Sequence, residues 1–418
     1  MAQKKPDQIL KLEKIICRKI KKIKAANLVD IFPSYCMDNN SEITGLNLKG
    51  CKITQLSHIE FFSDLIVLLL SDNQITNLSP LSKLTHLMHL DLIGNQIADL
   101  TPLANLKELR EIYLYGNQIT DISHLSNLTE LIVLNLSNNK LRDISPVSNL
   151  TKLKKLYCSM NSISQISPIS SLSELEILYL NSNSISDIMP LIPLKNIKQL
   201  NLSDNRIIDL SPIASLTHIT GLLLQKNKIS DFSPLTQLNN LKVLDLNSNS
   251  ITDITPLSAL TNLRRLYLNH NNIRDISPLK SLSHLEIINL DYNKIQDISP
   301  LAILPKLTLL DLSNNQITSI YSIECLKTLI YINLSNNKII ELSPIIPLLQ
   351  LTQLQYLDLT NNQISAIPKD FISTSLPIKW EITKSENTGI FLAGNPIEFP
   401  SAHIVQNEHN AMVPYSSN

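Results

Sequence analysis

Hydrophobic residues recur along most of the chain with a fixed period. Residues 65–75 read LIVLLLSDNQI and residues 87–97 read LMHLDLIGNQI, and both fit the pattern LxxLxLxxNxI. Alternation in the LxL part is the period of a β-strand whose leucines point inward. The pattern returns every 22 residues from Asn73 to Asn337. It therefore predicts a stack of similar coils, each with one short strand.

One polar position recurs in every coil, and we call its occupant the pattern residue. It is Cys51 in the first coil, and the last two steps, to Asn362 and Asn395, are 25 and 33 residues, which makes 16 coils, 15 with Asn and one with Cys. Because buried amides must be satisfied, we expect each Asn to hydrogen-bond to the backbone of adjacent coils. The regularly spaced ones are Asn73, Asn95, Asn117, Asn139, Asn161, Asn183, Asn205, Asn227, Asn249, Asn271, Asn293, Asn315 and Asn337.

The second half of each coil reads like D-I-S-P-L-x-x-L. Proline stands seven residues after the pattern residue in 11 of the 14 coils from Cys51 to Asn337. Proline keeps the preceding residue extended and favours the start of a tight turn. The spacing therefore predicts a 3₁₀ helix or a single helical turn in each coil.

The segment before the coils has a helical pattern instead. Ile9, Leu12, Ile16, Ile20 and Ile23 fall on one stripe of a helix over residues 7–24. Since the ends of a repeat stack need caps, we interpret it as a capping helix with a solvated basic face. The alternatives are a helix that binds an acidic partner or a membrane surface, or nucleic acid, which no aromatic interleaving supports. The region has a net charge of +7, from Lys4, Lys5, Lys11, Lys14, Arg18, Lys19, Lys21, Lys22 and Lys24 against Asp7 and Glu13.

These features resemble the leucine-rich repeat, whose consensus allows Asn or Cys at the pattern position. The likeness covers residues 43–399 and is greatest to the 22-residue subclass of bacterial internalins and eukaryotic phosphatase-1 regulatory subunits. It implies an α/β leucine-rich-repeat solenoid with a curved parallel sheet on the concave face, 3₁₀ or short helical turns on the convex face, and an N-terminal helical cap. The predicted parts are a basic helical cap (1–42), regular repeats (43–350), two longer irregular repeats (351–399) and a C-terminal tail (400–418).

The C-terminal stretch resembles the junction of bacterial Roco proteins, where leucine-rich repeats are followed by a Ras-like GTPase. Here the paired prolines of that family are reduced to Pro400, its glycine is missing from VQNEHNA, and the sequence ends at Asn418, where the GTPase would begin. The resemblance implies a sensor region without its GTPase. The matching residues are Leu376, Pro377, Ile378, Trp380, Gly389, Ile390, Leu392, Gly394, Asn395, Pro396, Ile404, Val405 and Tyr415.

Composition narrows the possible chemistry. Lys+Arg and Asp+Glu are both 36, so the net charge is zero and a chain-wide polyanion binder is excluded. Only 7 of 418 residues are glycine, and neither glycine pair with P-loop spacing is followed by lysine. The nine histidines form no HExxH motif. We therefore predict no enzyme, and no catalytic, cofactor-binding or metal site.

Cysteine usage and hydropathy bear on location. The five cysteines are widely spaced without a CxxC motif, which favours a reducing compartment over disulfides or zinc. No apolar run is long enough to predict a membrane span, and the Lys-rich N-terminus lacks a signal-peptide core. We predict a cytoplasmic protein, with delivery into a host cell without a Sec signal as the alternative.

Residues beside the strand leucines are predicted to face outward on the concave side. Five of the 11 tyrosines lie four or two residues before a pattern residue. Exposed aromatics with apolar neighbours are typical of interface anchors, although tyrosine also suits a strand for its own sake. The later coils are acidic at these positions. The predicted partner-binding residues are Val67, Leu69, Ile93, Tyr113, Tyr115, Tyr157, Tyr179, Asp245, Arg265, Tyr267, Asp291 and Asp311.

These observations favour a monomeric, non-enzymatic scaffold that binds a protein partner on the concave face. A partner with an apolar patch and a nearby basic patch would match that face. Neither nucleic acid nor a cofactor is expected. The alternatives are the sensor arm of a Roco-type signalling GTPase and a host-targeted bacterial effector.

Overall fold

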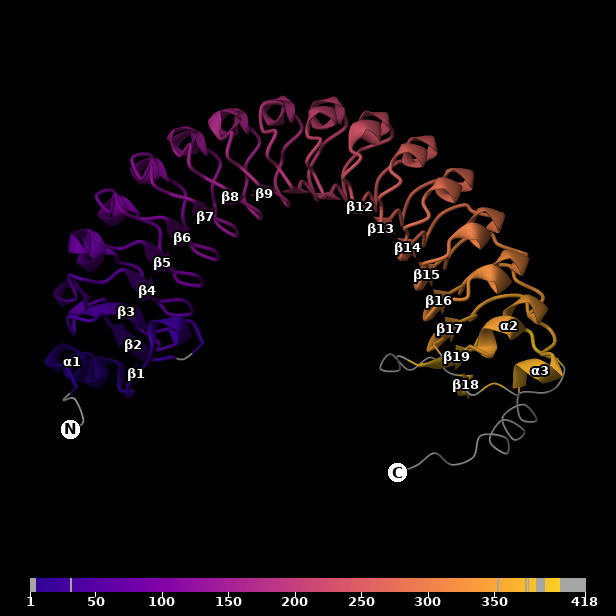
Figure 1. The fold of residues 1–418 in the computed structure, drawn as a ribbon, viewed down its shortest axis with the longest axis horizontal. Helices are drawn as coiled ribbons and strands as arrows, with labels where there is room; N and C mark the ends of the chain where they lie inside the picture. The colour runs from indigo at the N-terminus through magenta and orange to yellow at the C-terminus, as the bar shows by residue number, and fades with distance from the viewer. Residues whose placement is uncertain are drawn as a thin grey trace. The chain divides into compact units, whose positions relative to one another are not determined.

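The computed structural model describes residues 5–30, 32–351, 353–372, 374, 376–380 and 388–398. The chain divides into two compact units, residues 1–207 and 208–418. Within each unit the same coil repeats (Figure 1). A short strand is followed by the turn at the pattern residue, and a 3₁₀ helix then returns the chain to the next strand.

The first unit begins with helix α1 (Asp7–Ile16) and continues as a single sheet. Neighbouring strands are parallel and in register, so that Leu68 lies beside Leu90 and Leu90 beside Ile112. The exception is the antiparallel pair β2–β3. The strands are β1 (Lys21–Lys22), β2 (Ser34–Met37), β3 (Ile43–Asn47), β4 (Val67–Leu69), β5 (His89–Asp91), β6 (Glu111–Tyr113), β7 (Val133–Asn135), β8 (Lys155–Tyr157), β9 (Ile177–Tyr179) and β10 (Gln199–Asn201). The 3₁₀ helices are η1 (Ala25–Asn27), η2 (Ile59–Phe61), η3 (Ser79–Lys83), η4 (Thr101–Leu103), η5 (Ser123–Leu125), η6 (Ser145–Asn149), η7 (Ser167–Ser171) and η8 (Met189–Leu191).

The second unit repeats this arrangement with parallel strands. Its chain order changes only at the end, where β17 pairs with β19 and β18 lies outside β19. The strands are β11 (Gly221–Leu223), β12 (Val243–Asp245), β13 (Arg265–Tyr267), β14 (Ile287–Asn289), β15 (Leu309–Asp311), β16 (Tyr331–Asn333), β17 (Tyr356–Asp358), β18 (Ile378–Lys379) and β19 (Gly389–Phe391). The helices are η9 (Ser211–Ser215), η10 (Ser233–Gln237), η11 (Thr255–Ala259), η12 (Ser277–Ser281), η13 (Ser299–Ile303), η14 (Tyr321–Cys325), η15 (Ser343–Ile345), α2 (Ile346–Leu349) and α3 (Lys369–Ile372).

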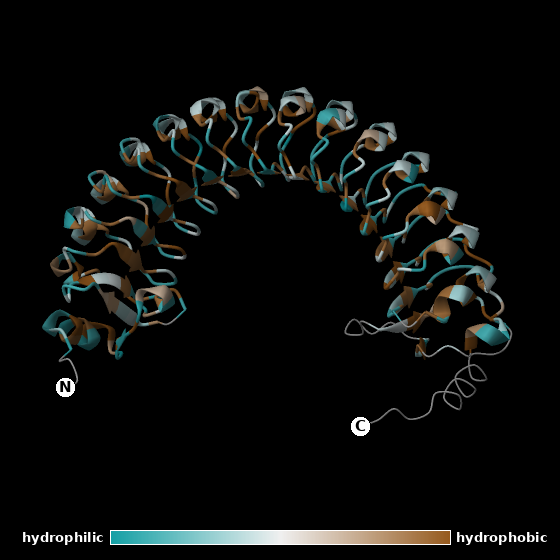
Figure 2. Ribbon diagram, viewed as in Figure 1, coloured by the Kyte–Doolittle hydropathy of each residue, from teal (hydrophilic) through white to brown (hydrophobic). Residues whose placement is uncertain are grey.

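The core of each unit lies between its strands and its 3₁₀ helices. Hydrophobic positions recur once per coil on the strand and again on the helical turn (Figure 2). Leu90 and Leu92 of one coil, and Leu244 and Leu246 of another, are fully buried. Each such side chain contributes roughly 1.5–3 kcal/mol of hydrophobic stabilisation. The inward orientation predicted for the LxL leucines is thus confirmed.

The pattern residues form the predicted hydrogen-bonded ladder. Asn95 Oδ1 accepts from the backbone N–H of Ile75 at 3.0 Å, and its Nδ2 donates to the carbonyl of Leu70 in the preceding coil at 3.0 Å. The same bonds extend to the last coil, where Asn395 Oδ1 accepts from the N–H of Ile364 at 3.2 Å. The 33-residue step therefore still delivers a coil that stacks on its neighbour.

The 3₁₀ turns form where the prolines predict them. In η4, Pro102 stands in the first turn. Asp99, two residues before this helix, caps its start through hydrogen bonds. Asp99 Oδ1 accepts from the N–H of Thr101 at 2.8 Å and from its hydroxyl at 2.6 Å. Side-chain oxygens of this kind satisfy a helix-start N–H that has no backbone partner. The same pairing recurs at Asp143 and Ser145.

The N-terminal helix is shorter than the stripe predicted. It ends at Ile16, because Cys17 takes a left-handed conformation with φ 53°. Ile20 is nevertheless buried, so Ile16, in the helix, and Ile20, outside it, both belong to the apolar core of the cap. Glu13 fixes the turn between them, since its Oε1 accepts from the N–H of Ile20 and pairs with Lys5 Nζ, both at 2.6 Å. Burial alone would raise the pKa of this carboxyl, but these contacts hold that pKa below its ordinary value.

Candidate functional site

The predicted site residues all lie on one side of the sheet in their own unit. We call this side the strand face; it consists of the residues six, four and two positions before each pattern residue. In strands such as β8 and β9 the middle side chain, Leu156 or Leu178, points into the core, and the residues on either side of it point away. Because the strands are in register, residues at equivalent positions form columns, with Tyr157 directly beside Tyr179.

The first unit carries two aromatic contacts on its strand face. The rings of Tyr157 and Tyr179 meet edge to face, with centroids 5.3 Å apart and an interplanar angle of 90°. This geometry suits the quadrupoles of the two rings. Both side chains remain half-buried in the free protein, and Tyr115 is 38% exposed. These tyrosines therefore offer apolar area that a partner could cover.

A polar cluster adjoins this pair. The carboxylate of Glu111 accepts from the hydroxyl of Tyr113 at 2.9 Å and lies 3.0 Å from His89 Nδ1. The rings of His89 and Tyr113 also meet, at 5.3 Å between centroids. Burial, together with the hydrogen bond to Glu111, raises the pKa of Tyr113, so its hydroxyl stays protonated. The tyrosine is thereby held in one orientation on the strand face.

One predicted contact residue is wrong. Leu69 is only 5% exposed, because the N-terminal segment folds over the strand face at β4. Leu69 packs there with Leu28 and Cys36, and Ile23 and Val67 pack against this cluster. Leu69 is therefore part of the core and is not available to a partner, while Val67 is partly covered. Further along the same unit, Ile93 is half-buried at its predicted place.

The acidic residues of the second unit are tied into a hydrogen-bond network. The carboxylate of Asp311 accepts from the N–H and hydroxyl of Ser313 at 3.0 and 2.6 Å. Asp291 accepts from the same hydroxyl at 2.8 Å and from Asn314 Nδ2 at 2.9 Å. Burial raises the pKa of Asp311, and likewise that of Asp245. These partly exposed carboxylates thus accept hydrogen bonds from the residues that follow the strands.

Asp245 and Tyr267 are cross-strand neighbours, and Arg265 begins the same strand as Tyr267. Arg265 is exposed, and Tyr267 is half-buried. The structure therefore places a basic, an aromatic and an acidic side chain together within two adjacent strands of the second unit. No ion pair links Asp245, Asp291 or Asp311 to a basic residue within the part of the chain that the structure describes.

Sequence reasoning missed one aromatic group. Tyr331 and Tyr356 stack with centroids 4.4 Å apart and an interplanar angle of 3°, and Phe391 adjoins Tyr356 at 5.0 Å. The two tyrosines stand six residues before their pattern residues, whereas the predicted tyrosines stand four or two residues before theirs. The alternation of side chains along a strand places this third column on the same face, so the repeat spacing is the signal that points to them.

Among the described residues, no group of three or more His, Cys, Asp or Glu side chains is placed to hold a metal ion. No described helix is both long and apolar enough to cross a membrane.

Comparison with known proteins agrees with the geometry. A family model described as leucine-rich repeats in two copies matches residues 63–105, 107–149, 151–193, 217–259, 261–303 and 327–373, which is more than half of the chain. A second leucine-rich-repeat model matches residues 283–339. No curated protein matches the chain.

Solved structures are similar over much of the chain. A leucine-rich-repeat protein of Leptospira interrogans is 27% identical with a TM-score of 0.80, over 95% of this chain and 99% of that one. An internalin of Listeria monocytogenes is 36% identical with a TM-score of 0.59, over 65% of this chain and 87% of the internalin. The plant peptide hormone receptor RGFR1, solved in complex with RGF2, shares the fold at 18% identity, with a TM-score of 0.58 over 90% of this chain and 73% of the receptor. With its repeating coils, asparagine ladder and matching family models, this chain belongs to the leucine-rich-repeat family.

Proposed function

We propose that the protein is a non-enzymatic scaffold that binds a protein partner through its strand face. The leucine-rich-repeat fold is typical of protein–protein interaction domains. The observation that carries the proposal is the tyrosine group of the first unit, in which the rings of Tyr157 and Tyr179 pack together and Tyr115 stands exposed nearby. Tyrosine supplies a large apolar area with few rotatable bonds and is enriched among the residues that dominate binding energy.

The polar groups around these rings favour specific binding of one partner over non-specific hydrophobic association. Glu111 holds Tyr113 in place, so little conformational entropy is lost when a partner covers it. The second unit contributes a different surface, in which Asp245, Asp291 and Asp311 face solvent without basic partners among the described residues. A partner that reaches this unit would suit it best with a basic patch.

The proposed setting is the cytoplasm, with the protein a monomer. All five cysteines are free thiols, as a reducing compartment would keep them. Cys158 is fully buried, and burial raises the pKa of its thiol to about 12, so it acts as a core side chain.

The experiment is affinity capture from source-cell lysate, read by mass spectrometry and followed by a binding isotherm with the purified partner. The baits are the wild-type chain, a variant with Tyr113, Tyr115, Tyr157 and Tyr179 all changed to Ala, and a control with Tyr292→Ala and Tyr321→Ala. The control tyrosines are exposed but lie outside the proposed surface. We expect the wild type and the control to capture the same partner. The variant that lacks the four tyrosines should bind this partner with a Kd at least tenfold higher.

A partner held equally by all three baits would contradict the strand-face proposal and direct attention to the N-terminal cap or the C-terminal coils. Capture of nothing would favour the other two hypotheses, a sensor arm separated from a Roco-type GTPase or a host-targeted effector. Host-cell lysate, and a search of neighbouring reading frames for a P-loop, would then separate those two.

A further inference from the structure

The outer surface of the N-terminal cap combines positive charge with exposed apolar side chains. Helix α1 buries Ile9, Leu12 and Ile16 against the first coils. Its opposite side faces solvent, as do the residues that follow as far as Lys24, apart from the buried Ile20 and the half-buried Ile23. This surface is separate from the strand face, so its role does not depend on the function proposed above.

The charge of this surface is one-sided. Residues 5–24 contain seven lysines, one arginine and only two acidic residues, although the whole chain is neutral. One of the two acids, Glu13, is turned inward, where it pairs with Lys5 at 2.6 Å and with Lys19 at 3.4 Å. Within the described residues, four of the exposed lysines of this segment make no ion pair: Lys11, Lys14, Lys21 and Lys24.

Apolar side chains stand among these charges. Leu10 is 36% exposed and Ile15 is 45% exposed, and helical spacing places each beside a cation, Lys14 and Lys11 respectively. A capping element needs a polar outer face to stay soluble. Capping alone therefore does not explain why two large aliphatic side chains are exposed to solvent among the lysines.

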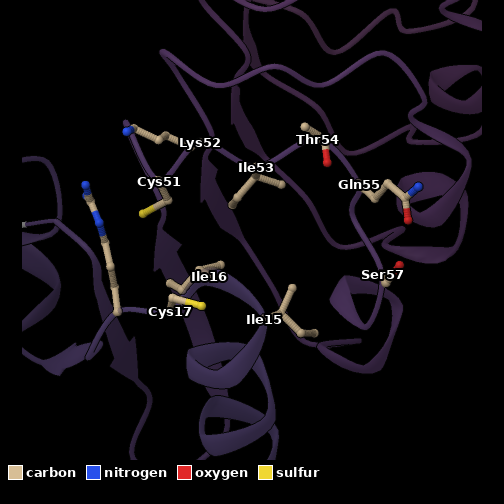
Figure 3. A pocket seen from close by; sticks show the side chains of 10 residues that line it. Ile15, Ile16, Cys17, Cys51, Lys52, Ile53, Thr54, Gln55 and Ser57 are labelled. Atoms are coloured by element: carbon tan, nitrogen blue, oxygen red, sulfur yellow. The ribbon is translucent and has the colours of Figure 1, made fainter.

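A groove adjoins the same surface. It has a volume of about 450 Å³ and lies between the end of α1 and residues 51–57 of the first coil (Figure 3). Ile15 and Ile53 line its apolar part, and Lys52 and Arg18 add positive charge to its lining. The apolar and cationic character of the helix thus continues into the neighbouring coil.

We propose that this N-terminal surface docks on an anionic lipid bilayer. Clusters of basic residues attract anionic headgroups, and apolar side chains beside them insert at the headgroup boundary. Here Lys11 and Lys14 stand on α1, and Lys21 and Lys24 stand in the segment that follows it. Lysine dominates here, and a lysine is a mobile point charge, whereas close recognition of single carboxylates favours the planar arginine fork. The surface therefore suits a diffuse sheet of negative charge better than an acidic protein with fixed carboxylates.

The test is co-sedimentation of the full chain with phosphatidylcholine vesicles, with and without phosphatidylserine. We expect binding only to the phosphatidylserine vesicles, and weaker binding as salt is raised. Changing Lys11, Lys14, Lys21 and Lys24 to Gln should lower the partition coefficient by on the order of several hundred-fold. Leu10→Ser with Ile15→Ser should lower it by roughly tenfold or more.

The matched control changes four exposed lysines elsewhere in the first unit, Lys83, Lys107, Lys140 and Lys195, to Gln, which alters the net charge by the same amount. This control and the four-tyrosine variant should bind vesicles as the wild type does, and circular dichroism melts should show that all variants fold. Equal binding to both vesicle types, or an equal loss in the lysine control, would overturn the proposal. So would binding to polyglutamate in the absence of vesicle binding, which would assign the surface to an acidic protein.

Discussion

Asn95 Oδ1 and the backbone N–H of Ile75 join two consecutive coils through a hydrogen bond of 3.0 Å that is buried from solvent. The same amide donates to carbonyls of its own coil and of the preceding one, so a single side chain satisfies backbone groups in both. Because the Asn stands at the same place in successive coils, hydrogen bonds of this kind connect each coil to the next along the core of each unit.

Removing one amide from the ladder should be costly. In Asn95→Ala, the buried N–H of Ile75 loses its acceptor, and such an unsatisfied group costs about 1–3 kcal/mol. The carbonyl of Leu70 loses one of its two amide donors and keeps Asn73 Nδ2, and the removed side chain also leaves a small space in the core. We expect the free energy of unfolding to fall by about 2–4 kcal/mol in urea denaturation. Gln96→Ala is the control, because that side chain is exposed; it should change stability by less than about 0.5 kcal/mol. Similar losses in the two variants would count against the ladder.

The strand register is tested at an inward leucine. Leu246 is fully buried in the second unit, so Leu246→Ala should lower the free energy of unfolding by about 2–5 kcal/mol through lost contacts and a cavity. Ile208→Ala is the control in the same unit, since Ile208 is 61% exposed. An unchanged melting curve for Leu246→Ala would refute the register.

The residue before each pattern residue adopts a left-handed backbone in coil after coil, as Gly94 (φ 64°) and Met160 (φ 55°) do. A Cβ at Gly94 would also approach Asp72 Oδ1 to 2.9 Å. We therefore expect Gly94→Ala to destabilise the fold by about 1–2 kcal/mol in chemical denaturation.

The reverse change, Met160→Gly, should be neutral or slightly stabilising, because the Met160 side chain is exposed and its left-handed conformation is strained. Destabilisation of both variants by the same amount would show that backbone conformation is not what distinguishes these positions.

Two groups of carboxylates predict opposite responses to pH. Hydrogen bonds from the hydroxyl and N–H of Ser145 hold the pKa of Asp143 below its ordinary value. Its stabilising contribution is therefore complete above the unfolded pKa of about 3.9 and is lost as the pH falls through the lower folded value. Burial raises the pKa of Asp311, so its ionised form destabilises the fold at a pH above the folded pKa. This penalty disappears as the pH falls and the carboxyl is protonated.

Neutralising these two aspartates should accordingly move the melting temperature at pH 7 in opposite directions. Asp143→Asn is expected to lower Tm, since it weakens contacts made by the ionised form. Asp311→Asn is expected to raise Tm, provided its amide oxygen still accepts from Ser313. Each variant should approach the wild type as the pH falls through the folded pKa of the wild-type carboxyl, which for Asp311 lies above the ordinary value and for Asp143 below it. Calorimetry across this pH range would check both signs, and shifts of the same sign would contradict the assignment.

The repeating parts of this protein are predictable from its amino-acid sequence alone. A period of 22 residues brings equivalent residues to equivalent places, so Leu90, Asn95 and Asp99 could each be assigned a position, a partner type and a direction from the pattern alone. The strand-face tyrosines, such as Tyr157, were located by the same logic, because side chains alternate along a strand and columns align between in-register strands.

Where the 22-residue period fails, the position of a side chain depends on tertiary contacts. Leu69 occupies an outward position by its spacing, yet Leu28 from the non-repeating N-terminal segment covers it. Helix α1 ends at Ile16 although the apolar stripe continues, because Ile20 reaches the core from an extended backbone that Glu13 holds in place. Such contacts join residues with no fixed spacing, and their free energy depends on how a whole segment folds back on the sheet, which periodicity does not encode.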